Sequence, residues 1–346
     1  MKATLEQEKL KLAKWWEPTE NNKLLCTLCP RYCKIGDGQP GFCYIRQNHG
    51  GKLYTIGYGR PTGFAIDPVE KKPLNHFLPG TTILSFGTAG CNLGCKFCQN
   101  WSISKAKLDD LNSLTATPEA VVNLAKRYST PSIAFTYNDP TIFGEYVIDI
   151  SEIAKAEGIK SVMVTAGYID KEARKDVYKF IDAANVDLKG FTERFYWKNT
   201  YSHINDVLDT LIWLKNETNV WFEITTLLIP DENDSEEEVK NECEWILKNL
   251  GDSIPLHFTA FHPDFRMMDK EKTPEKTLTT ARNIARSLGI KYCYVGNVHN
   301  IEGQTTYCPN CNNKLIIRNW HDVTSIKMKN GKCFKCNTTI PGVFQN

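Results

Sequence analysis

The chain has 346 residues, of which 41% are apolar and 24% are charged, a composition typical of a globular protein with a sizeable core. Its 42 basic and 40 acidic residues give a net charge of +2, so the total charge offers no argument for binding nucleic acid or a membrane surface. No apolar run approaches the roughly 18 residues of a membrane helix, and residues 1–10 form a charged segment that favours a helix rather than a signal peptide. We therefore expect a cytoplasmic protein.

Cysteines mark the organisation of the chain. Of its 13 cysteines, all but Cys243 and Cys293 fall into three tight clusters. In a reducing compartment such clusters indicate metal ligands rather than disulfides. Cys243 lies in a helical pattern and Cys293 in an apolar strand, so we expect both to be packed thiols.

The first cluster contains Cys26, Cys29, Cys33 and Cys43, and we call it the N-terminal quartet. The glycines at positions 36, 38 and 41 would let the loop fold back, so that the last cysteine reaches the other three. The quartet could hold zinc or an iron–sulfur cluster, or only some of its members could bind metal. Residues 1–78 form the predicted N-terminal Cys-rich module, which is too short for a core of its own and would gain stability from the metal.

Residues 79–302 alternate short apolar or β-branched runs with amphipathic helical patterns, which predicts an α/β domain with a parallel sheet. Helix starts are marked by Thr117-Pro118, Asp234-Ser235 and Thr273-Pro274. The predicted strands are 82–86, 132–136, 160–165, 185–188, 220–228, 256–261 and 291–295. The predicted helices are 118–128, 143–157, 170–183, 204–215, 235–249 and 274–288.

The second cluster follows the first of these strands and reads C-x3-C-x2-C at Cys91, Cys95 and Cys98. We call residues 90–100 the cluster loop. A cubic [4Fe–4S] cluster ordinarily takes four thiolates, so a local set of three leaves one iron open for another ligand. A zinc site or a set of disulfides fits less well, because zinc normally takes four ligands from paired knuckles.

Polar residues follow the other strands at the points where they end. Asn138 and Asp139 follow the second strand, Thr165 ends the third, Asp187 and Lys189 follow the fourth, and His262 follows the sixth. The carboxyl ends of parallel strands meet at one edge of a sheet, so the sequence predicts that these residues gather beside the cluster loop.

The third cluster, Cys308, Cys311, Cys333 and Cys336, is named the C-terminal quartet and has the pattern C-x2-C, 21 residues, C-x2-C. Two such knuckles close a tetrahedral site, so residues 303–346 are predicted to form a zinc-ribbon-like module, with a rubredoxin-like iron site as the alternative. Four thiolates leave the metal no open position. We therefore expect a structural or partner-docking role.

The cluster loop, with an aromatic residue before its last cysteine, resembles the radical S-adenosylmethionine (SAM) superfamily. The resemblance implies a partial (β/α)6 TIM-like radical SAM barrel in which the open iron chelates SAM. The segments 28–33, 67–77, 137–141 and 187–190 narrow the resemblance to the radical SAM proteins of the AmmeMemoRadiSam system, which are related to the pyruvate formate-lyase activating enzymes.

The resemblance also implies roles for individual residues. Cys91, Cys95 and Cys98 would ligate the [4Fe–4S] cluster and so be the catalytic residues. The residues that the resemblance assigns to cofactor binding are Asn100, Asn138, Asp139, Thr165, Asp187, Lys189 and His262.

Some of these residues have a structural alternative. Asp139 could form an Asx-type turn, Asp187 and Lys189 could be a structural ion pair, and Thr165 and His262 could be ordinary turn residues.

The predicted function is reductive cleavage of SAM to a 5′-deoxyadenosyl radical that abstracts hydrogen from a protein or small-molecule substrate. Activation of a glycyl-radical enzyme is one alternative, and a metal-binding assembly scaffold is another. The resemblance implies AMMECR1-like and Memo-like proteins as partners and a reductant such as flavodoxin or ferredoxin. In this scheme the N-terminal quartet would hold zinc or an auxiliary iron–sulfur cluster.

An RNA-modifying enzyme is the remaining alternative, because basic residues accompany the outer cysteine modules and could form a local basic surface. These residues are Arg31, Arg46, Lys314, Arg318, Lys327, Lys329, Lys332 and Lys335. Lysine and arginine around metal knuckles are usually only solvated, so nucleic acid is the weaker prediction.

Overall fold

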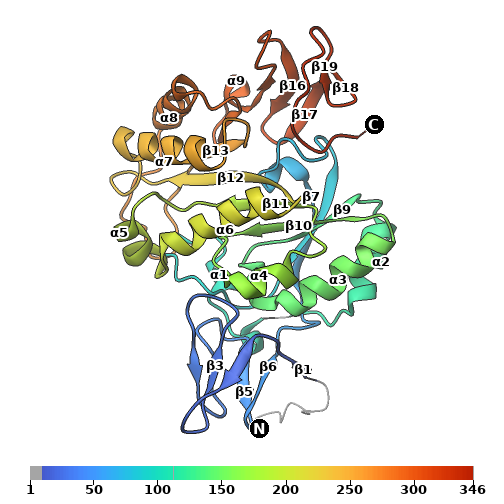
Figure 1. Ribbon diagram of the computed structural model, residues 1–346, viewed down its shortest axis with the longest axis vertical. Coiled ribbons are helices and arrows are strands. Elements are labelled where there is room, and N and C mark those ends of the chain that lie inside the picture. The colour runs from blue at the N-terminus through green and yellow to red at the C-terminus, as the bar shows by residue number, and fades with distance from the viewer. Residues whose placement is uncertain (1–9, 112, 346) are drawn as a thin grey trace.

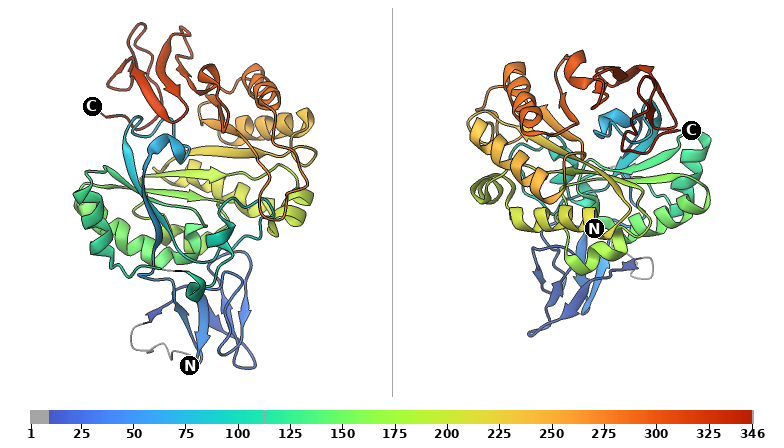
Figure 2. Two further views of the ribbon diagram at one scale, coloured as in Figure 1. Left: turned by 180° about the vertical axis from the view of Figure 1, so that it is seen from behind. Right: turned by 45° about the horizontal axis from the view of Figure 1, so that its top comes forward.

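The computed structural model describes residues 10–111 and 113–345. Most of the helix predicted for residues 1–10 therefore lies outside the described residues. A central sheet with helices forms the body of the molecule, and the two outer cysteine modules lie at opposite ends of its long axis (Figures 1 and 2). Among the helices of the described part of the chain, none is long and apolar enough to cross a membrane.

The central sheet has eight strands in the order β14-β13-β12-β11-β10-β9-β8-β7. Strands β8 to β14 are parallel to their neighbours, and β7 pairs with β8 in the antiparallel direction. The sheet is open, with β7 and β14 at its edges. The strands are β7 Thr62–Pro68, β8 Thr82–Gly87, β9 Ser132–Phe135, β10 Lys160–Thr165, β11 Ala183–Asp187, β12 Trp221–Leu228, β13 Leu256–Ala260 and β14 Cys293–Gly296.

This sheet confirms the predicted parallel α/β arrangement, since each of the seven predicted strands is found. The fourth strand begins earlier than predicted, because Ala183 and Ala184 are fully buried and pair with β10 and β12 instead of extending the preceding helix. Strand β7 lies within the predicted N-terminal module, yet it is an integral part of the central sheet.

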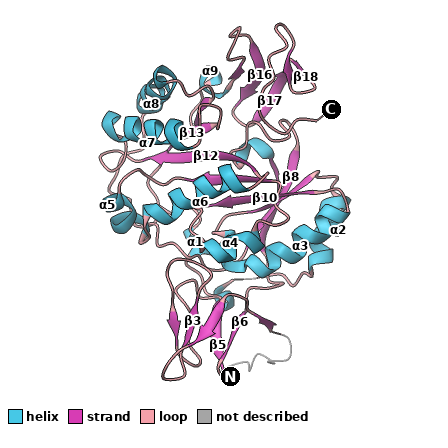
Figure 3. Cartoon of the chain, viewed as in Figure 1, coloured by secondary structure: helices cyan, strands magenta, loops and turns pink. Residues whose placement is uncertain are grey.

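Helices connect the parallel strands, as Figure 3 shows. Thr117, Asp170 and Ser235 are N-cap residues. The side chain of each accepts a backbone N–H from the first turn of its helix, which fixes where the helix begins. The helices are α1 Trp101–Ser104, α2 Pro118–Arg127, α3 Gly144–Ala156, α4 Lys171–Val177, α5 Glu193–Phe195, α6 Ile204–Glu217, α7 Glu236–Asn249, α8 Glu275–Leu288 and α9 Ile301–Gln304. Short 3-10 turns occupy Val69–Lys71, Leu108–Asp110 and Pro140–Phe143, and a π-helical turn occupies Tyr196–Thr200.

The N-terminal module consists of two small sheets, β1-β6-β5 and β2-β3-β4. Arg46 on β5 is buried and lies 3.0 Å from both carboxylate oxygens of Glu145 on α3, so a buried ion pair joins the module to the core. The six strands are β1 Lys11–Leu12, β2 Trp16–Pro18, β3 Leu24–Cys26, β4 Lys34–Ile35, β5 Arg46–His49 and β6 Lys52–Thr55.

The C-terminal module consists of the sheet β15-β16-β17 and the hairpin β18-β19. Arg318 on β16 is buried and lies 3.5 Å from Glu70, so a second buried ion pair joins this module to the core. Arg46 and Arg318 therefore do not belong to a basic surface, which corrects that part of the prediction. The strands are β15 Thr306–Tyr307, β16 Lys314–Asn319, β17 Asp322–Ile326, β18 Met328–Lys329 and β19 Lys332–Cys333.

Candidate active site

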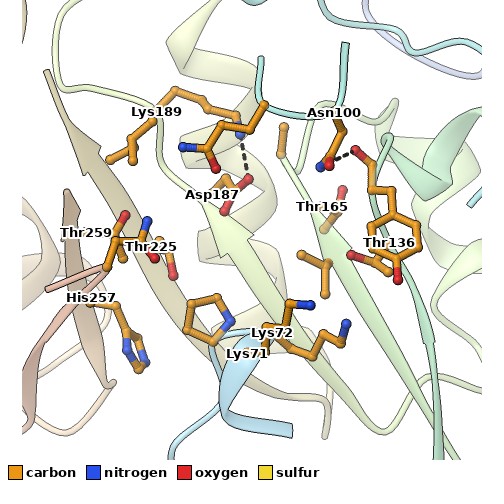
Figure 4. Close-up of a pocket in the computed structure, with 18 of the residues that line it drawn as sticks. Lys71, Lys72, Asn100, Thr136, Thr165, Asp187, Lys189, Thr225, His257 and Thr259 are labelled. Atoms are coloured by element: carbon orange, nitrogen blue, oxygen red, sulfur yellow. Dashed lines mark hydrogen bonds and ion pairs between the residues drawn. The ribbon is translucent and has the colours of Figure 1, made fainter. Parts of the chain in front are cut away.

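A cavity of about 480 Å³ lies at the carboxyl ends of the parallel strands. Its walls come from the cluster loop, the central sheet, the turn around Lys71 and the C-terminal module. Figure 4 shows Asn100, Asp187 and Lys71 around this cavity. The residues predicted from sequence that line it are Cys91, Cys95, Cys98, Asn100, Asn138, Asp139, Thr165, Asp187 and Lys189. Of the residues that the sequence assigns to the cluster and to SAM, only His262 is absent from the lining of this cavity.

The start of the cluster loop is held by Asn138. Its side-chain amide donates to the Gly90 carbonyl over 2.8 Å and to the Thr88 hydroxyl over 3.1 Å, and its oxygen accepts the Thr88 N–H. Gly90 has a φ of +80°, and a Cβ there would lie 1.9 Å from the Cys43 carbonyl oxygen. Only glycine fits this position, and Asn138 positions the loop.

The rest of the loop is fixed through its backbone. Asn92 donates its side-chain amide to the Tyr168 carbonyl over 2.8 Å, and Lys105 donates to the Leu93 carbonyl over 2.6 Å. The N–H groups of Gly94 and Lys96 donate to carbonyls of the π-helical turn over 2.8 and 2.9 Å. These contacts hold the three thiols in place without using their sulfur atoms.

The thiols of the loop suit a cluster better than a single ion. Within the described residues, Cys91, Cys95 and Cys98 are not among the sets whose ligand atoms all lie within 4.8 Å of one another. The Leu93 N–H faces the Cys91 sulfur at 3.4 Å, and the Ser104 hydroxyl lies 3.1 Å from the Cys98 sulfur. No fourth cysteine is found among the described residues that line the cavity, so a cluster held by these three thiols would have one iron left for another ligand.

Asp139 forms the Asx-type turn that was the alternative for this residue. Its Oδ1 accepts the Thr141 N–H over 2.9 Å, its Oδ2 accepts the Ala166 N–H over 2.8 Å, and the Thr165 hydroxyl donates to both oxygens. Burial raises the pKa of this carboxyl above its usual value, and these hydrogen bonds offset only part of that effect. Asp139 therefore ties the ends of β9 and β10 together at the wall of the cavity.

Asp187 and Lys189 lie on the same face of the chain at the end of β11, as their spacing of two residues predicts. The Lys189 ammonium donates to Asp187 over 2.5 Å, and Figure 4 shows the pair pointing toward one another at the cavity wall. Burial lowers the pKa of Lys189, but Asp187 and the nearby Cys95 sulfur raise it by a larger amount. The pKa of Lys189 is therefore above its usual value. The lysine is therefore a fixed positive charge next to the cluster loop.

His262 is the residue that the structure does not bring to the cavity. It is exposed, and its ring lies 3.3 Å from the Pro263 carbonyl. His257, which lies on β13, lines the cavity instead and pairs with the buried Glu223 over 2.7 Å. Sequence reasoning missed this pair, because a histidine within an apolar strand is more often a satisfied core residue than a site residue.

Two further walls of the cavity were not predicted. Lys71 and Lys72 line it from the turn after β7 and bind Asp67 over 2.9 and 2.6 Å. Arg318, Trp320 and His321 line it from the C-terminal module. The motif at 67–77 was a usable signal for the two lysines. The position of Arg318, Trp320 and His321 depends on how the C-terminal module docks on the core, which the sequence does not show.

The C-terminal quartet converges on one point, which confirms the prediction that its four thiols form a metal-binding group. All four sulfur atoms lie within 4.8 Å of one another, with Cys308 to Cys336 at 3.5 Å and Cys311 to Cys333 at 3.6 Å. Thiolates around a tetrahedral ion with bonds of about 2.3 Å stand about 3.8 Å apart. Hydrogen bonds from Thr338 lower the pKa of the Cys336 thiol to about 5, which favours the thiolate that a metal needs.

Comparisons with known proteins agree with this site. The model of the Radical SAM superfamily matches residues 86–243, which include the cluster loop. An uncharacterised protein of Methanocaldococcus jannaschii, MJ0808, is 41% identical over 95% of this chain and 98% of its own length. The pyruvate formate-lyase-activating enzyme of Clostridium pasteurianum is 25% identical over 53% of this chain and 83% of its own.

A solved structure supports the fold alone. The crystal structure of Streptococcus suis SuiB bound to precursor peptide SuiA has a TM-score of 0.50 at 14% identity, over 67% of this chain and 52% of that one. Taken together, the cluster loop and the family match define the class: the chain contains a Radical SAM domain, matched over residues 86–243. It shares nearly its full length with the Methanocaldococcus protein and is similar to the activating enzymes, and its family uses a [4Fe–4S] cluster and SAM.

Proposed function

We propose that this enzyme cleaves SAM reductively at the cluster loop and uses the resulting radical to remove hydrogen from a substrate bound in the cavity of about 480 Å³. The observation that carries the proposal is that Cys91, Cys95 and Cys98 line this cavity together with polar residues at the carboxyl ends of β9, β10 and β11. When bound, the cluster and SAM supply the one-electron chemistry, and the protein supplies binding and orientation.

The residues of this chain have separable tasks in the proposal. The three cysteines would hold the cluster, and the backbone contacts of the loop would keep its open corner toward the cavity. Asn100, whose amide donates to the Tyr137 carbonyl over 3.0 Å, borders the same space as Thr165 (Figure 4). These two residues, Asn138 and Asp139 would border SAM, and the paired charges of Asp187 and Lys189 would orient its polar groups.

The carboxyl-terminal metal is part of the proposal. The spacing of the sulfur atoms in the C-terminal quartet supports one tetrahedral ion, and zinc is the metal that most often takes four thiolates in this pattern. With no open position, the zinc would act by holding the module whose Arg318, Trp320 and His321 border the cavity.

A second candidate is activation of a glycyl-radical enzyme. The similarity to the Clostridium pasteurianum enzyme favours it. The substrate would then be a glycine in a partner protein, and an anaerobic mixture with that partner should develop a glycyl signal in electron paramagnetic resonance. AMMECR1-like and Memo-like proteins are the partners that the AmmeMemoRadiSam resemblance suggests, and deuterium transfer from a labelled candidate into 5′-deoxyadenosine would identify the substrate.

The main experiment is an anaerobic SAM-cleavage assay with dithionite on the Cys95→Ala variant. We expect 5′-deoxyadenosine formation to be lost while the metal of the C-terminal quartet remains bound. Cys243→Ala is the matched control, since it removes a buried thiol of α7 that belongs to no cysteine cluster and should leave activity unchanged. Normal 5′-deoxyadenosine formation by Cys95→Ala would refute the proposal.

A further inference from the structure

The N-terminal quartet surrounds a cavity of its own. Cys26, Cys29, Cys33 and Cys43 all line it, together with apolar residues such as Ile35 and Ile142. Three of the four cysteines are buried, and Cys33 is half-buried. The fold therefore brings together four thiols that lie on β3 and in the loops before and after β4, in a module with little core of its own.

The spacing of these thiols differs from that of the C-terminal quartet. Within the described residues, the C-terminal quartet is the only set of potential ligand atoms that all lie within 4.8 Å of one another. No three sulfur atoms of the N-terminal quartet meet that limit, and neither do those of the cluster loop. A single tetrahedral ion needs sulfur atoms about 3.8 Å apart, whereas each thiolate of a [4Fe–4S] cube binds a different iron and stands farther from the others.

The N-terminal quartet also lies directly against the cluster loop. The carbonyl of Cys43 packs so closely on Gly90 that a Cβ there would lie 1.9 Å from its oxygen, and Gly90 precedes Cys91. Arg31, which lies between Cys29 and Cys33, donates to the Asn92 carbonyl, and Asn92 lines the N-terminal cavity as well. Cys26, Cys33 and Cys43 pack in the same core cluster as the three thiols of the cluster loop, whereas the C-terminal quartet packs in a separate cluster.

We propose that the N-terminal quartet holds a second iron–sulfur cluster, in the simplest case [4Fe–4S], and that this cluster passes electrons to the cluster loop. The first part is supported by the wide spacing of the four thiols, three of them buried, and the second by the direct contact between the two loops. Cys33 is half-buried and is flanked by Tyr32 and Phe42, which are 46% and 42% exposed, so the quartet is near the surface where an external donor can approach.

The electron balance of this relay is simple and rests on the proposed function. A reduced protein of the flavodoxin or ferredoxin class gives up one electron, which passes through the second cluster and the cluster of the loop to the sulfonium of SAM. The bond between sulfur and C5′ breaks, and the products are methionine and the 5′-deoxyadenosyl radical. The donor is oxidised by one electron, and no proton is consumed.

Metal analysis separates the second cluster from the proposed function. The full-length variant Cys91→Ala/Cys95→Ala/Cys98→Ala, reconstituted anaerobically with iron and sulfide, should retain about four irons and four sulfides per chain. It should also retain about one zinc. Adding Cys26→Ala and Cys29→Ala should remove the iron, whereas adding Cys308→Ala and Cys311→Ala should remove only the zinc. A triple variant with about two zinc ions and no iron would overturn the inference, even if the cluster loop itself proved active.

The relay has a separate readout in the variant Cys33→Ala/Cys43→Ala, in which the cluster loop is intact. Its SAM cleavage should fall about tenfold or more with reduced flavodoxin, but less than about threefold with dithionite, which can reach the cluster loop directly. Equal losses with both reductants would overturn the relay. If this variant fails to fold, the milder Cys33→Ser, compared under both reductants, decides between the same outcomes. Absence of iron at an intact cluster loop would count against the proposed function instead.

Discussion

The two outer cysteine modules are joined to the core in the same way but differ in what they enclose. Each is docked by a buried arginine that pairs with a core carboxylate, Arg46 with Glu145 and Arg318 with Glu70. The C-terminal quartet is compact enough for one ion and has a small apolar cluster of its own. The N-terminal quartet is wider and shares the main core with the cluster loop. Equal cysteine counts therefore accompany different surroundings. This difference is expected if the C-terminal quartet holds a structural ion and the N-terminal quartet holds the proposed iron–sulfur cluster.

The largest effect should follow removal of the C-terminal metal. Apparent binding free energies of structural zinc are about 10 kcal/mol or more, and the apolar cluster of this module is small. In Cys308→Ala/Cys311→Ala we expect loss of zinc and rapid proteolysis within residues 303–346, together with loss of the cavity wall that contains Arg318. Metal analysis and limited proteolysis measure both. Cys26→Ala is the control and should keep both the zinc and a protected module.

The two buried arginines provide a direct test of the comparison. Removing one partner of a buried ion pair costs about 3–5 kcal/mol, because the other charge is left without compensation. Arg46 contacts both oxygens of Glu145 at 3.0 Å, whereas Arg318 lies 3.5 Å from Glu70, one of whose oxygens has no hydrogen-bond partner. Burial also raises the pKa of Glu70, so this carboxyl can become neutral at lower cost.

We therefore expect Arg46→Met to reduce the free energy of unfolding in urea by about 3–5 kcal/mol and Arg318→Met to reduce it by less. Arg46→Met/Glu145→Met should recover most of the loss, since no buried charge then remains. A larger loss for Arg318→Met, or no recovery in the double variant, would contradict this account of how the modules are anchored.

A glycine pair tests the contact between the N-terminal quartet and the cluster loop. Gly90 and Gly158 both have positive φ values, +80° and +72°, but only Gly90 faces another group, the Cys43 carbonyl, whereas nothing lies within 4 Å of a Cβ at Gly158. Gly158→Ala should cost about 1 kcal/mol from backbone strain alone. Gly90→Ala should cost about 3 kcal/mol, because overpacking is added to that strain.

Urea unfolding measures both glycine variants. Iron content and dithionite-driven SAM cleavage should fall only in Gly90→Ala, since only this change displaces the residue before Cys91. Equal effects of the two substitutions would mean that the contact between the loops is unimportant.

The sequence predicted the scaffold better than the environment of the site. Strand ends and the cysteine spacing placed Cys91, Asn138 and Asp187 at one edge of the sheet, because strand order and parallel direction follow from the repeated β-α pattern. The distances between thiols cannot be read from the spacing of cysteines, so the sequence left zinc and an iron–sulfur cluster both open for the N-terminal quartet.

Arg318 and His257 show a second limit of prediction from sequence, which is that it does not reveal tertiary packing. Arg318 was read as a solvated residue of a metal knuckle, but its module docks on the core and buries it. His257 gave no signal because it lies in an apolar strand, and its partner Glu223 is distant in sequence. Both depend on tertiary packing, which local patterns do not encode.

The smallest predicted effect is a pH dependence in the docking of the C-terminal module. His76 donates from Nδ1 to the Pro341 carbonyl over 2.7 Å, since a carbonyl can only accept, and its Nε2 therefore accepts from Tyr294 over 2.6 Å. Burial lowers the pKa of His76 to about 4, although Glu223 and the Pro341 carbonyl raise it, and Arg318 and His257 lower it further. The ring is thus buried in its neutral form.

Because the folded-state pKa of His76 lies below the value of about 6.5 in the unfolded chain, the unfolded chain binds more protons between these values. The stability that neutral His76 contributes is present above about pH 6.5 and is lost as the pH falls toward 4, which amounts to about 1.3 kcal/mol between pH 7.5 and 5.5. Urea unfolding of the wild type and His76→Gln across this range measures the difference, and the variant should lose that part of the slope. His262→Gln, which removes an exposed ring, should keep the wild-type slope. A wild-type slope in His76→Gln would mean that this histidine does not couple the module to pH.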